Sequence, residues 1–128
     1  MPRAKQLTLW VSDQPGMLGE IATALGAKKV NVLALMGATE GGPGAIRLVV
    51  DKTAAAKKLF ATRGWQTTEE EVLAVELGHT PGTLGKVATK LGKAGVNIEY
   101  VYGGPAGGRK VNAYFGVSDV KAALKAAR

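Results

Sequence analysis

The sequence of 128 residues lacks cysteine and contains a single histidine. Without cysteine there are no disulfides, thiolate metal sites, iron–sulfur clusters or cysteine nucleophiles, and a reducing compartment is the natural expectation. One histidine without cysteine makes a weak metal site. We therefore expect neither a metal nor a cofactor.

Long apolar runs are also missing. No stretch has the length and apolar character of a signal peptide or a membrane span, and the first residues lead directly into an alternating segment. From this pattern we expect a cytoplasmic protein without a membrane partner.

Acidic residues are few: 10 Asp and Glu stand against 17 Lys and Arg, which gives a formal net charge of +7. Such an excess raises the question of a nucleic-acid partner or an anionic surface. The basic residues, however, fall on or near predicted helices among alanine and leucine, which is typical of a solvated helix face. They include Lys28, Lys29, Lys57, Lys58, Lys86, Lys90, Lys93, Lys121, Lys125 and Arg128.

A repeat extends through most of the sequence. When the sequence is shifted by 66 residues, positions 7–39 align with positions 73–105 without a gap, and twelve positions are identical. The shared pattern is Pro-Gly-x-Leu-Gly, then Ala-Thr-x-Leu-Gly, then Val-Asn followed by Val or Ile. The chain is therefore expected to contain two domains of one type, residues 1–67 and residues 68–128.

Each copy of the repeat predicts a strand, a helix, two strands and a second helix. Apolar residues alternate along the first strand, and they recur at helical spacing after each Pro-Gly. We expect Thr53 and Ser118 to be helix N-caps and Gly64 to follow a helix end as C′. The predicted helices lie near 16–28, 53–63, 82–94 and 118–127, and the predicted strands over 7–11, 30–36, 46–50, 73–77, 96–102 and 111–117.

This order of elements predicts an α+β fold of two tandem ferredoxin-like βαββαβ units, each an antiparallel sheet with its helices on one face. The second unit is expected to lack its own last strand, and residues 65–77 can form one long strand that serves both units. Glu69–Glu71 is expected to be a solvated strand edge. Because exposed strand edges are usually paired or covered, we expect a homodimer or a strand that bridges the two units.

Two Pro-Gly turns are candidate binding sites. Gly16 and Gly82 lie where a strand becomes a helix, so the first N–H groups of that helix are free to bind a carboxylate. Glycine also allows a ligand to approach the backbone. The alternative is that Pro-Gly only makes a tight turn between strand and helix. In either case the proline is expected in the first helical turn, where its missing N–H costs little.

Four polar residues accompany these turns at equal spacing. Asp13 can accept a hydrogen bond from a ligand ammonium, His79 can donate to a carboxylate, and the amides of Asn31 and Asn97 can do either. The alternatives are an N-cap for Asp13, an exposed turn histidine for His79 and turn-capping asparagines. No second acid, base or nucleophile recurs beside them, so we expect no catalytic residues and no enzyme.

The motif residues resemble those of the ACT domain. The first copy has Asp13, Gln14, Pro15, Gly16, Met17 and Leu18 followed by Val-Asn-Val at Asn31, and the second has His79, Thr80, Pro81, Gly82, Thr83 and Leu84 followed by Val-Asn-Ile at Asn97. The resemblance covers almost the whole chain. It implies ferredoxin-like units that bind amino acids at interfaces between paired domains, with both loops as ligand sites and each asparagine completing a site from a neighbouring unit.

By this resemblance the chain is expected to be a stand-alone amino-acid sensor without catalytic activity. It would form a homodimer and act on a metabolic enzyme or a regulator in trans. One alternative is a structural or interaction subunit that binds no ligand. Another is an RNA-binding module of the same topology, which needs aromatic residues on its central strands; only Trp10, Tyr114 and Phe115 are candidates.

Overall fold

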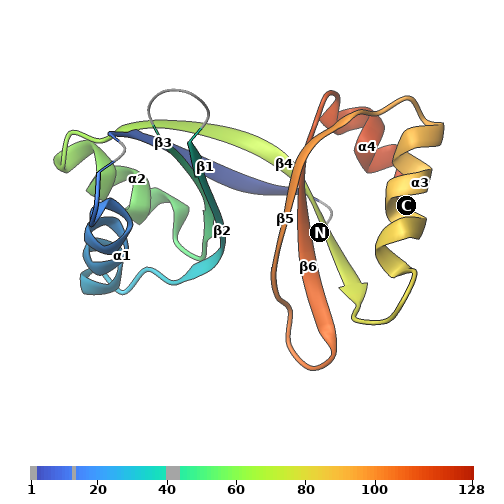
Figure 1. Cartoon of the computed structure of the whole chain (residues 1–128), viewed down its shortest axis with the longest axis horizontal. Helices are drawn as coiled ribbons and strands as arrows, with labels where there is room; N and C mark the ends of the chain where they lie inside the picture. Colours follow the sequence, from blue (N-terminus) through green and yellow to red (C-terminus); the bar gives the residue numbers. More distant parts are fainter. Residues whose placement is uncertain (1–2, 13, 40–43) are drawn as a thin grey trace. The chain divides into compact units, whose positions relative to one another are not determined.

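A computed structural model describes residues 3–12, 14–39 and 44–128 of the chain. Contacts divide it into two compact units: a first unit of residues 5–70, and a second unit of residues 71–128 together with Arg3 and Ala4. The elements in chain order are β1 (Arg3–Val11), α1 (Met17–Ala27), β2 (Val32–Thr39), β3 (Gly44–Val50), α2 (Thr53–Thr62), β4 (Gln66–Gly78), α3 (Thr83–Lys93), β5 (Ile98–Pro105), β6 (Lys110–Val117) and α4 (Val120–Ala126) (Figure 1).

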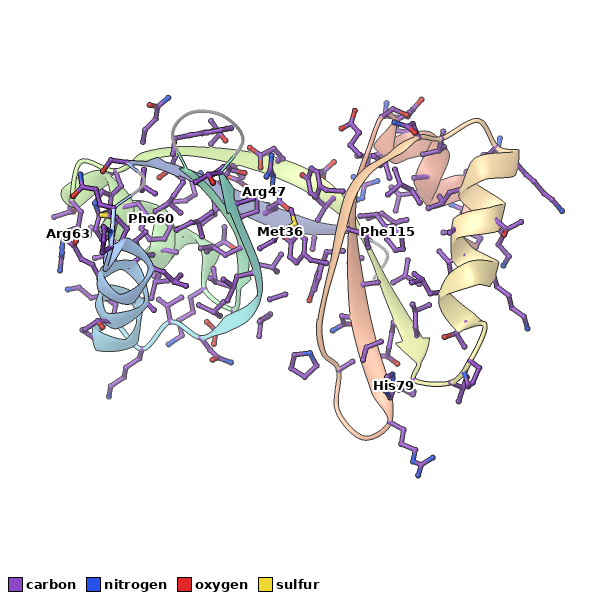
Figure 2. All side chains as sticks on the ribbon, in the orientation of Figure 1. Met36, Arg47, Phe60, Arg63, His79 and Phe115 are labelled. Carbon is purple, nitrogen blue, oxygen red and sulfur yellow. The ribbon has the colours of Figure 1, made fainter. Side chains whose placement is uncertain are left out.

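The first unit is a sheet with the strand order β2-β3-β1-β4 and with α1 and α2 on one face. The alternation along β1 directs Leu7 and Leu9 toward the helices, and both are fully buried. Leu9 lies opposite Ile46 of β3, so neighbouring strands present apolar residues to the same side. Phe60 of α2 fills the centre of this core (Figure 2).

The second unit repeats this arrangement with the strand order β4-β6-β5 and the helices α3 and α4. Its core contains Leu73, Leu91 and Phe115, which are fully buried (Figure 2). The predicted α+β fold and the four predicted helices are therefore confirmed. No helix in the described part of the chain is long and apolar enough to cross a membrane.

Strand β4 is a single strand of 13 residues that contributes to both units. Its first part, as far as Glu70, belongs to the sheet of the first unit, and its continuation from Glu71 belongs to the sheet of the second. The prediction of one long strand serving both copies is confirmed.

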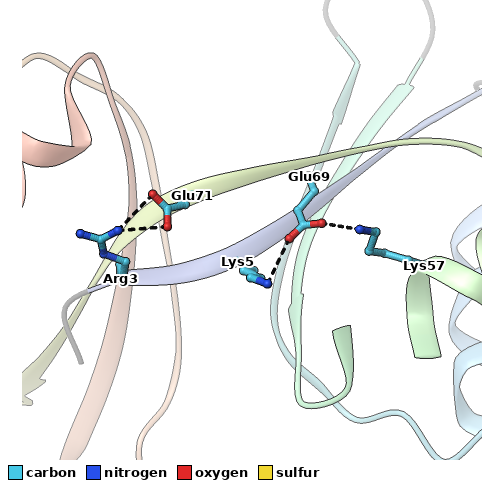
Figure 3. A network of polar contacts seen from close by, with 5 residues as sticks. All are labelled: Arg3, Lys5, Lys57, Glu69 and Glu71. Atoms are coloured by element: carbon cyan, nitrogen blue, oxygen red, sulfur yellow. Dashed lines mark hydrogen bonds and ion pairs between the residues drawn. The ribbon is translucent and has the colours of Figure 1, made fainter. Parts of the chain in front are cut away.

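The glutamates of β4 are paired with side chains of neighbouring elements (Figure 3). Arg3 of β1 forms an ion pair with Glu71 at 3.2 Å in the second unit. In the first unit, Glu69 contacts Lys57 at 2.6 Å and Lys5 at 3.7 Å. The hydrogen bond from Lys57 lowers the pKa of the Glu69 carboxyl below its ordinary value. Exposed pairs of this kind contribute little to stability, because solvent screens the charges.

Glu70 has a different environment from its two neighbours. Gln6 and Thr8 of β1 are buried polar residues, and both donate hydrogen bonds to Glu70 Oε1, at 3.0 and 2.7 Å. The prediction that the three glutamates form a solvated edge is therefore wrong for Glu70, because polar side chains of β1 lie beside it and bind its carboxylate.

Two of the predicted helix caps are displaced by one residue. Thr53 is the first residue of α2 and not its cap, and Asp119 caps α4 by accepting a hydrogen bond from Ala122 N at 3.0 Å. The hydroxyl of Ser118 instead accepts from Asn97 N at 3.1 Å. Gly64 follows α2 with φ of 71°, as predicted for a C′ residue.

The turns that follow α1 and α3 include the residues predicted to begin the next strands, Val30 and Val96. Val30 N donates to Leu25 O at 3.0 Å, and Val96 N donates to Leu91 O at 2.9 Å. These bonds close the helix ends, so β2 and β5 begin two residues later than predicted. Such a closure needs a left-handed residue just before the valine.

The left-handed position is occupied by Lys29 in the first copy, with φ of 59°, and by Gly95 in the second, with φ of 76°. Because a side chain with Cβ is strained there, Lys29→Gly is expected to raise the free energy of unfolding by about 1 kcal/mol. Urea denaturation measures the change. Lys28→Gly is the matched control: φ of Lys28 is −94°, so glycine there is expected to lower stability. A loss of stability in Lys29→Gly would contradict the prediction.

Candidate ligand-binding site

Each Pro-Gly forms a tight turn between a strand and a helix. Gly16 has φ 91° and ψ −8°, and Gly82 has φ 91° and ψ −13°, which are the values of the third residue of a type II turn. The prolines occupy the second position of the turn and precede the helices. The prediction that they lie in the first helical turn is wrong, because the left-handed glycine separates them from the helix.

The two glycines are the N-cap residues of α1 and α3. Among the described residues, no side chain caps either helix, and the first helical bond in each runs to the glycine carbonyl, from Glu20 N at 2.9 Å and from Lys86 N at 3.1 Å. Backbone N–H groups at an uncapped helix N-terminus favour an anion such as a carboxylate.

A hollow of about 420 Å³ lies beside the turn in the first unit. It is bounded by the turn and the start of α1 on one side, and by the end of β2 and the start of β3 on the other. Its floor is mainly aliphatic. It is lined by Val11, Ser12, Gln14, Met17, Leu18, Leu35, Gly37, Ala38, Thr39, Gly44, Ala45 and Ile46.

A second hollow of about 380 Å³ lies at the equivalent place in the second unit, and residues of the same repeat positions line both. Leu18 and Leu84 correspond, as do Leu35 and Val101; all four are between 42% and 51% exposed. The second hollow is lined by Leu77, Gly78, His79, Thr80, Gly82, Thr83, Leu84, Val101, Tyr102, Gly103, Val111, Asn112 and Ala113.

Comparisons with protein-family models and with curated proteins find no match. Solved structures do match. Protein BT0572 from Bacteroides thetaiotaomicron is 27% identical, over 97% of this chain and 85% of that one, with a TM-score of 0.87. The ligand-free regulatory subunit of aspartate kinase from Thermus thermophilus is 19% identical, over 98% and 90% of the two chains, with a TM-score of 0.66. The regulatory subunit of aspartate kinase from Thermus flavus is 19% identical, over 99% of this chain and 95% of that one, with a TM-score of 0.60.

The chain has the fold of two ACT domains in tandem. Two observations support this statement: the fold matches that of the aspartate kinase regulatory subunits, and each unit has the expected order of strands and helices. The ACT unit thus contains the strand–turn–helix segment and the strand hairpin that together surround each hollow.

Most of the predicted site residues lie at the hollows of the two ACT units. Pro15, Gly16 and Pro81 shape the turns without lining a hollow, and Asp13 lies outside the described residues. Those that line a hollow are Gln14, Met17, Leu18, His79, Thr80, Gly82, Thr83 and Leu84.

Asn31 and Asn97 lie elsewhere in their own units. Each precedes a strand whose far end reaches the hollow, so Asn31 is separated from Gly37 by about 20 Å of extended chain. Neither asparagine lines the hollow of its own unit. Asn31 N donates a hydrogen bond to Asp51 Oδ1 at 2.9 Å, and Asp51 N donates to Asn31 O at 3.1 Å. Asn31 itself is exposed.

The sequence analysis missed the hairpin side of each hollow. The repeat contained a signal for it, because Gly37 and Gly103 are identical in the two copies and lie outside the Pro-Gly motif. The other hairpin residues, such as Leu35 and Val101, match only in their apolar character. Such positions are indistinguishable from core positions until the fold shows that they border open space.

Tyr102 of β5 stacks on Tyr114 of β6 with ring centroids 5.5 Å apart, and burial raises the pKa of the Tyr114 phenol above its ordinary value. Along these strands the two tyrosines alternate with Gly103 and Ala113, so they lie on the face of the sheet opposite the core. The residues that the hairpins direct toward the two hollows are therefore mainly apolar. Among the described residues, no cluster of His, Asp and Glu fits a metal ion.

The turn geometry gives a stability prediction. A Cβ at Gly82 has no atom within 4 Å, yet its φ of 91° is strained for any L residue, so Gly82→Ala is expected to lower the free energy of unfolding by about 1–3 kcal/mol. Gly85→Ala is the matched control in α3, where alanine is the better helix former and is expected to stabilise by up to about 1 kcal/mol. Equal effects of the two substitutions in thermal denaturation would refute this account. The same strain applies at Gly16, so Gly16→Val is expected to perturb the turn as well as the hollow.

Proposed function

We propose that the chain is an amino-acid sensor without catalytic activity, in which the hollow beside each Pro-Gly turn holds a small amino acid. The observation that carries the proposal is the recurrence of the same hollow, at the same helix N-terminus, in both ACT units. This recurrence argues against the alternative that Pro-Gly only makes a tight turn, because a turn by itself does not require a hollow beside it.

The chemistry of the hollows suits the two ends of an amino acid. The backbone N–H groups at the helix start attract the carboxylate. Ser12 and Gln14 line the polar side of the first hollow and are joined by a hydrogen bond of 2.8 Å from Gln14 Nε2 to Ser12 Oγ. In the sequence Asp13 lies between them, and we propose that its carboxylate accepts from the ligand ammonium.

A regulatory role is supported by the fold. Regulatory subunits of aspartate kinase have it, and they match nearly the whole of this chain. We propose that this protein likewise responds to an amino acid and acts on a metabolic enzyme or regulator in trans, within the cytoplasm. The described residues around the hollows include no paired acid and base or activated nucleophile, which favours binding over catalysis.

Self-association would complete the sites. One exposed face of α1 carries small residues at helical spacing, Gly19, Ala22, Thr23 and Gly26, and the same four residue types recur on α3. Small residues allow close helix packing, and the exposed Leu18 continues this face toward the hollow. We propose a homodimer in which Asn31 and Asn97 reach the hollows of neighbouring units.

An RNA-binding role is less well supported. Of the three aromatic candidates, Phe115 belongs to the core of the second unit and is 1% exposed, so it is not available to stack on a base. Tyr114 is also buried, at 4% exposure.

The proposal predicts thermal stabilisation by an amino acid. Scanning fluorimetry of the whole chain against the twenty amino acids is expected to show an increase in Tm for one chemical class, since a ligand at 100 times its Kd stabilises by about 2.7 kcal/mol. Asp13→Ala or Asn31→Ala is expected to weaken binding about 10- to 150-fold, the loss of a charge-assisted hydrogen bond. His79→Ala and Asn97→Ala should have smaller effects if the first site binds more tightly. Binding unchanged in all four variants would eliminate the site assignment.

The proposed dimer is tested by sedimentation. Thr23→Arg places a long charged side chain on the small-residue face of α1 and is expected to shift the protein to monomer at micromolar concentration. Ala54→Arg makes a similar change on an exposed position of α2 and is expected to leave the dimer intact. A wild-type protein that remains monomeric at high concentration would exclude the dimer.

A further inference from the structure

Gly37 of β2 and Gly103 of β5 occupy equivalent positions, and each lines the hollow of its unit. Each lies within a strand at the end of the sheet order of its unit. Glycine weakens a strand, because it loses more backbone entropy on folding and has no side chain to contribute to packing. Its presence at both positions therefore needs a physical reason.

Backbone conformation does not supply that reason. Neither Gly37 nor Gly103 has a positive φ, whereas Gly16 and Gly82 in the turns do. Any L residue can adopt an extended conformation at these two strand positions.

Packing among the described residues does not supply it either. A Cβ at Gly37 would have Ile46 Cγ1 as its nearest neighbour, at 3.8 Å, and a Cβ at Gly103 would have Asn112 O at 3.6 Å; both are ordinary contacts. Gly116 is the contrasting case, because a Cβ there would fall within the ring of Tyr100. The structure describes every residue from Glu71 to Arg128, so no undescribed residue of the second unit fills the space beside Gly103.

A side chain at either position would project into the hollow. Gly37 lies opposite Ile46 and Gly103 opposite Ala113, and both partners belong to the core face of their sheets. The space next to Gly37 is bordered by Leu18 and Leu35. The missing side chains thus leave open an apolar part of each hollow, on the hairpin side.

We infer that Gly37 and Gly103 determine ligand size, and that they admit the aliphatic side chain of an amino acid such as leucine, isoleucine or valine. This inference rests on the proposed function. The ligand carboxylate lies at the helix N-terminus, and the aliphatic side chain extends over the glycine, between the helix start and the outermost strand. A charged side chain would lose its hydration there without a counter-charge.

Calorimetry of the whole chain with leucine, valine, alanine and lysine as probes tests the inference. The double variant Gly37→Ala with Gly103→Ala adds one methyl group to each floor, where the distances leave room for it. Leucine affinity is expected to fall roughly 10-fold, alanine affinity to change less than 2-fold, and the preference to shift toward the smaller ligand. The corresponding valine double variant is expected to lose leucine binding by about 100-fold or more.

Ala54→Val is the control. Ala54 is exposed on α2, lines neither hollow, and lies outside the small-residue faces of α1 and α3. The control is expected to bind leucine as the wild type does. A shift in ligand preference is a result that general loss of stability does not produce, and thermal denaturation of each variant checks the fold.

The outcomes separate this inference from the proposed function. If leucine binds the wild type and the Gly37 and Gly103 alanine variant equally well, the glycines do not set ligand size and the inference is overturned while the sensor proposal stands. If lysine binds and leucine does not, the aliphatic class is overturned and the sensor proposal again stands. If none of the twenty amino acids binds the wild type, both fail.

Discussion

The left-handed glycine of each Pro-Gly turn is the constraint on which the rest of the site depends. With φ of 91°, Gly16 and Gly82 end the short connection from strand to helix and allow the helix to begin at the next residue. In the described part of the chain, no side chain caps the helix start. This arrangement exposes backbone N–H groups beside a hollow, which is a feature of both ACT units.

The two ACT units preserve backbone interactions more strictly than side-chain chemistry. The residue after each buried valine pairs through its backbone with the end of the second hairpin strand, but Asn31 uses the carboxylate of Asp51 where Asn97 uses the hydroxyl of Ser118. The hollows follow the same rule, since apolar residues at equivalent repeat positions line both, while Ser12 and Gln14 of the first correspond to Gly78 and Thr80 of the second.

Much of the architecture could be predicted from sequence because it rests on local patterns that occur twice. Apolar alternation located the strands, helical spacing located four helices, and Gly64 marked a helix end. Errors occurred where two local solutions compete. Proline suits the first turn of a helix, but the left-handed Gly16 is the N-cap, so Pro15 lies before the helix. Ser118 is a good cap by residue type, but the carboxylate of Asp119 is the group that accepts from Ala122 N.

The sequence by itself determined the repeat, the α+β fold class, the Pro-Gly turns as sites of interest and β4 as one long strand. Only the tertiary structure decided what faces those turns. It brought the ends of β2 and β5 to the hollows and left Asn31 and Asn97 at the other ends of the same strands. The physical reason is that strand order and register set which distant segments adjoin, and no local pattern carries that information.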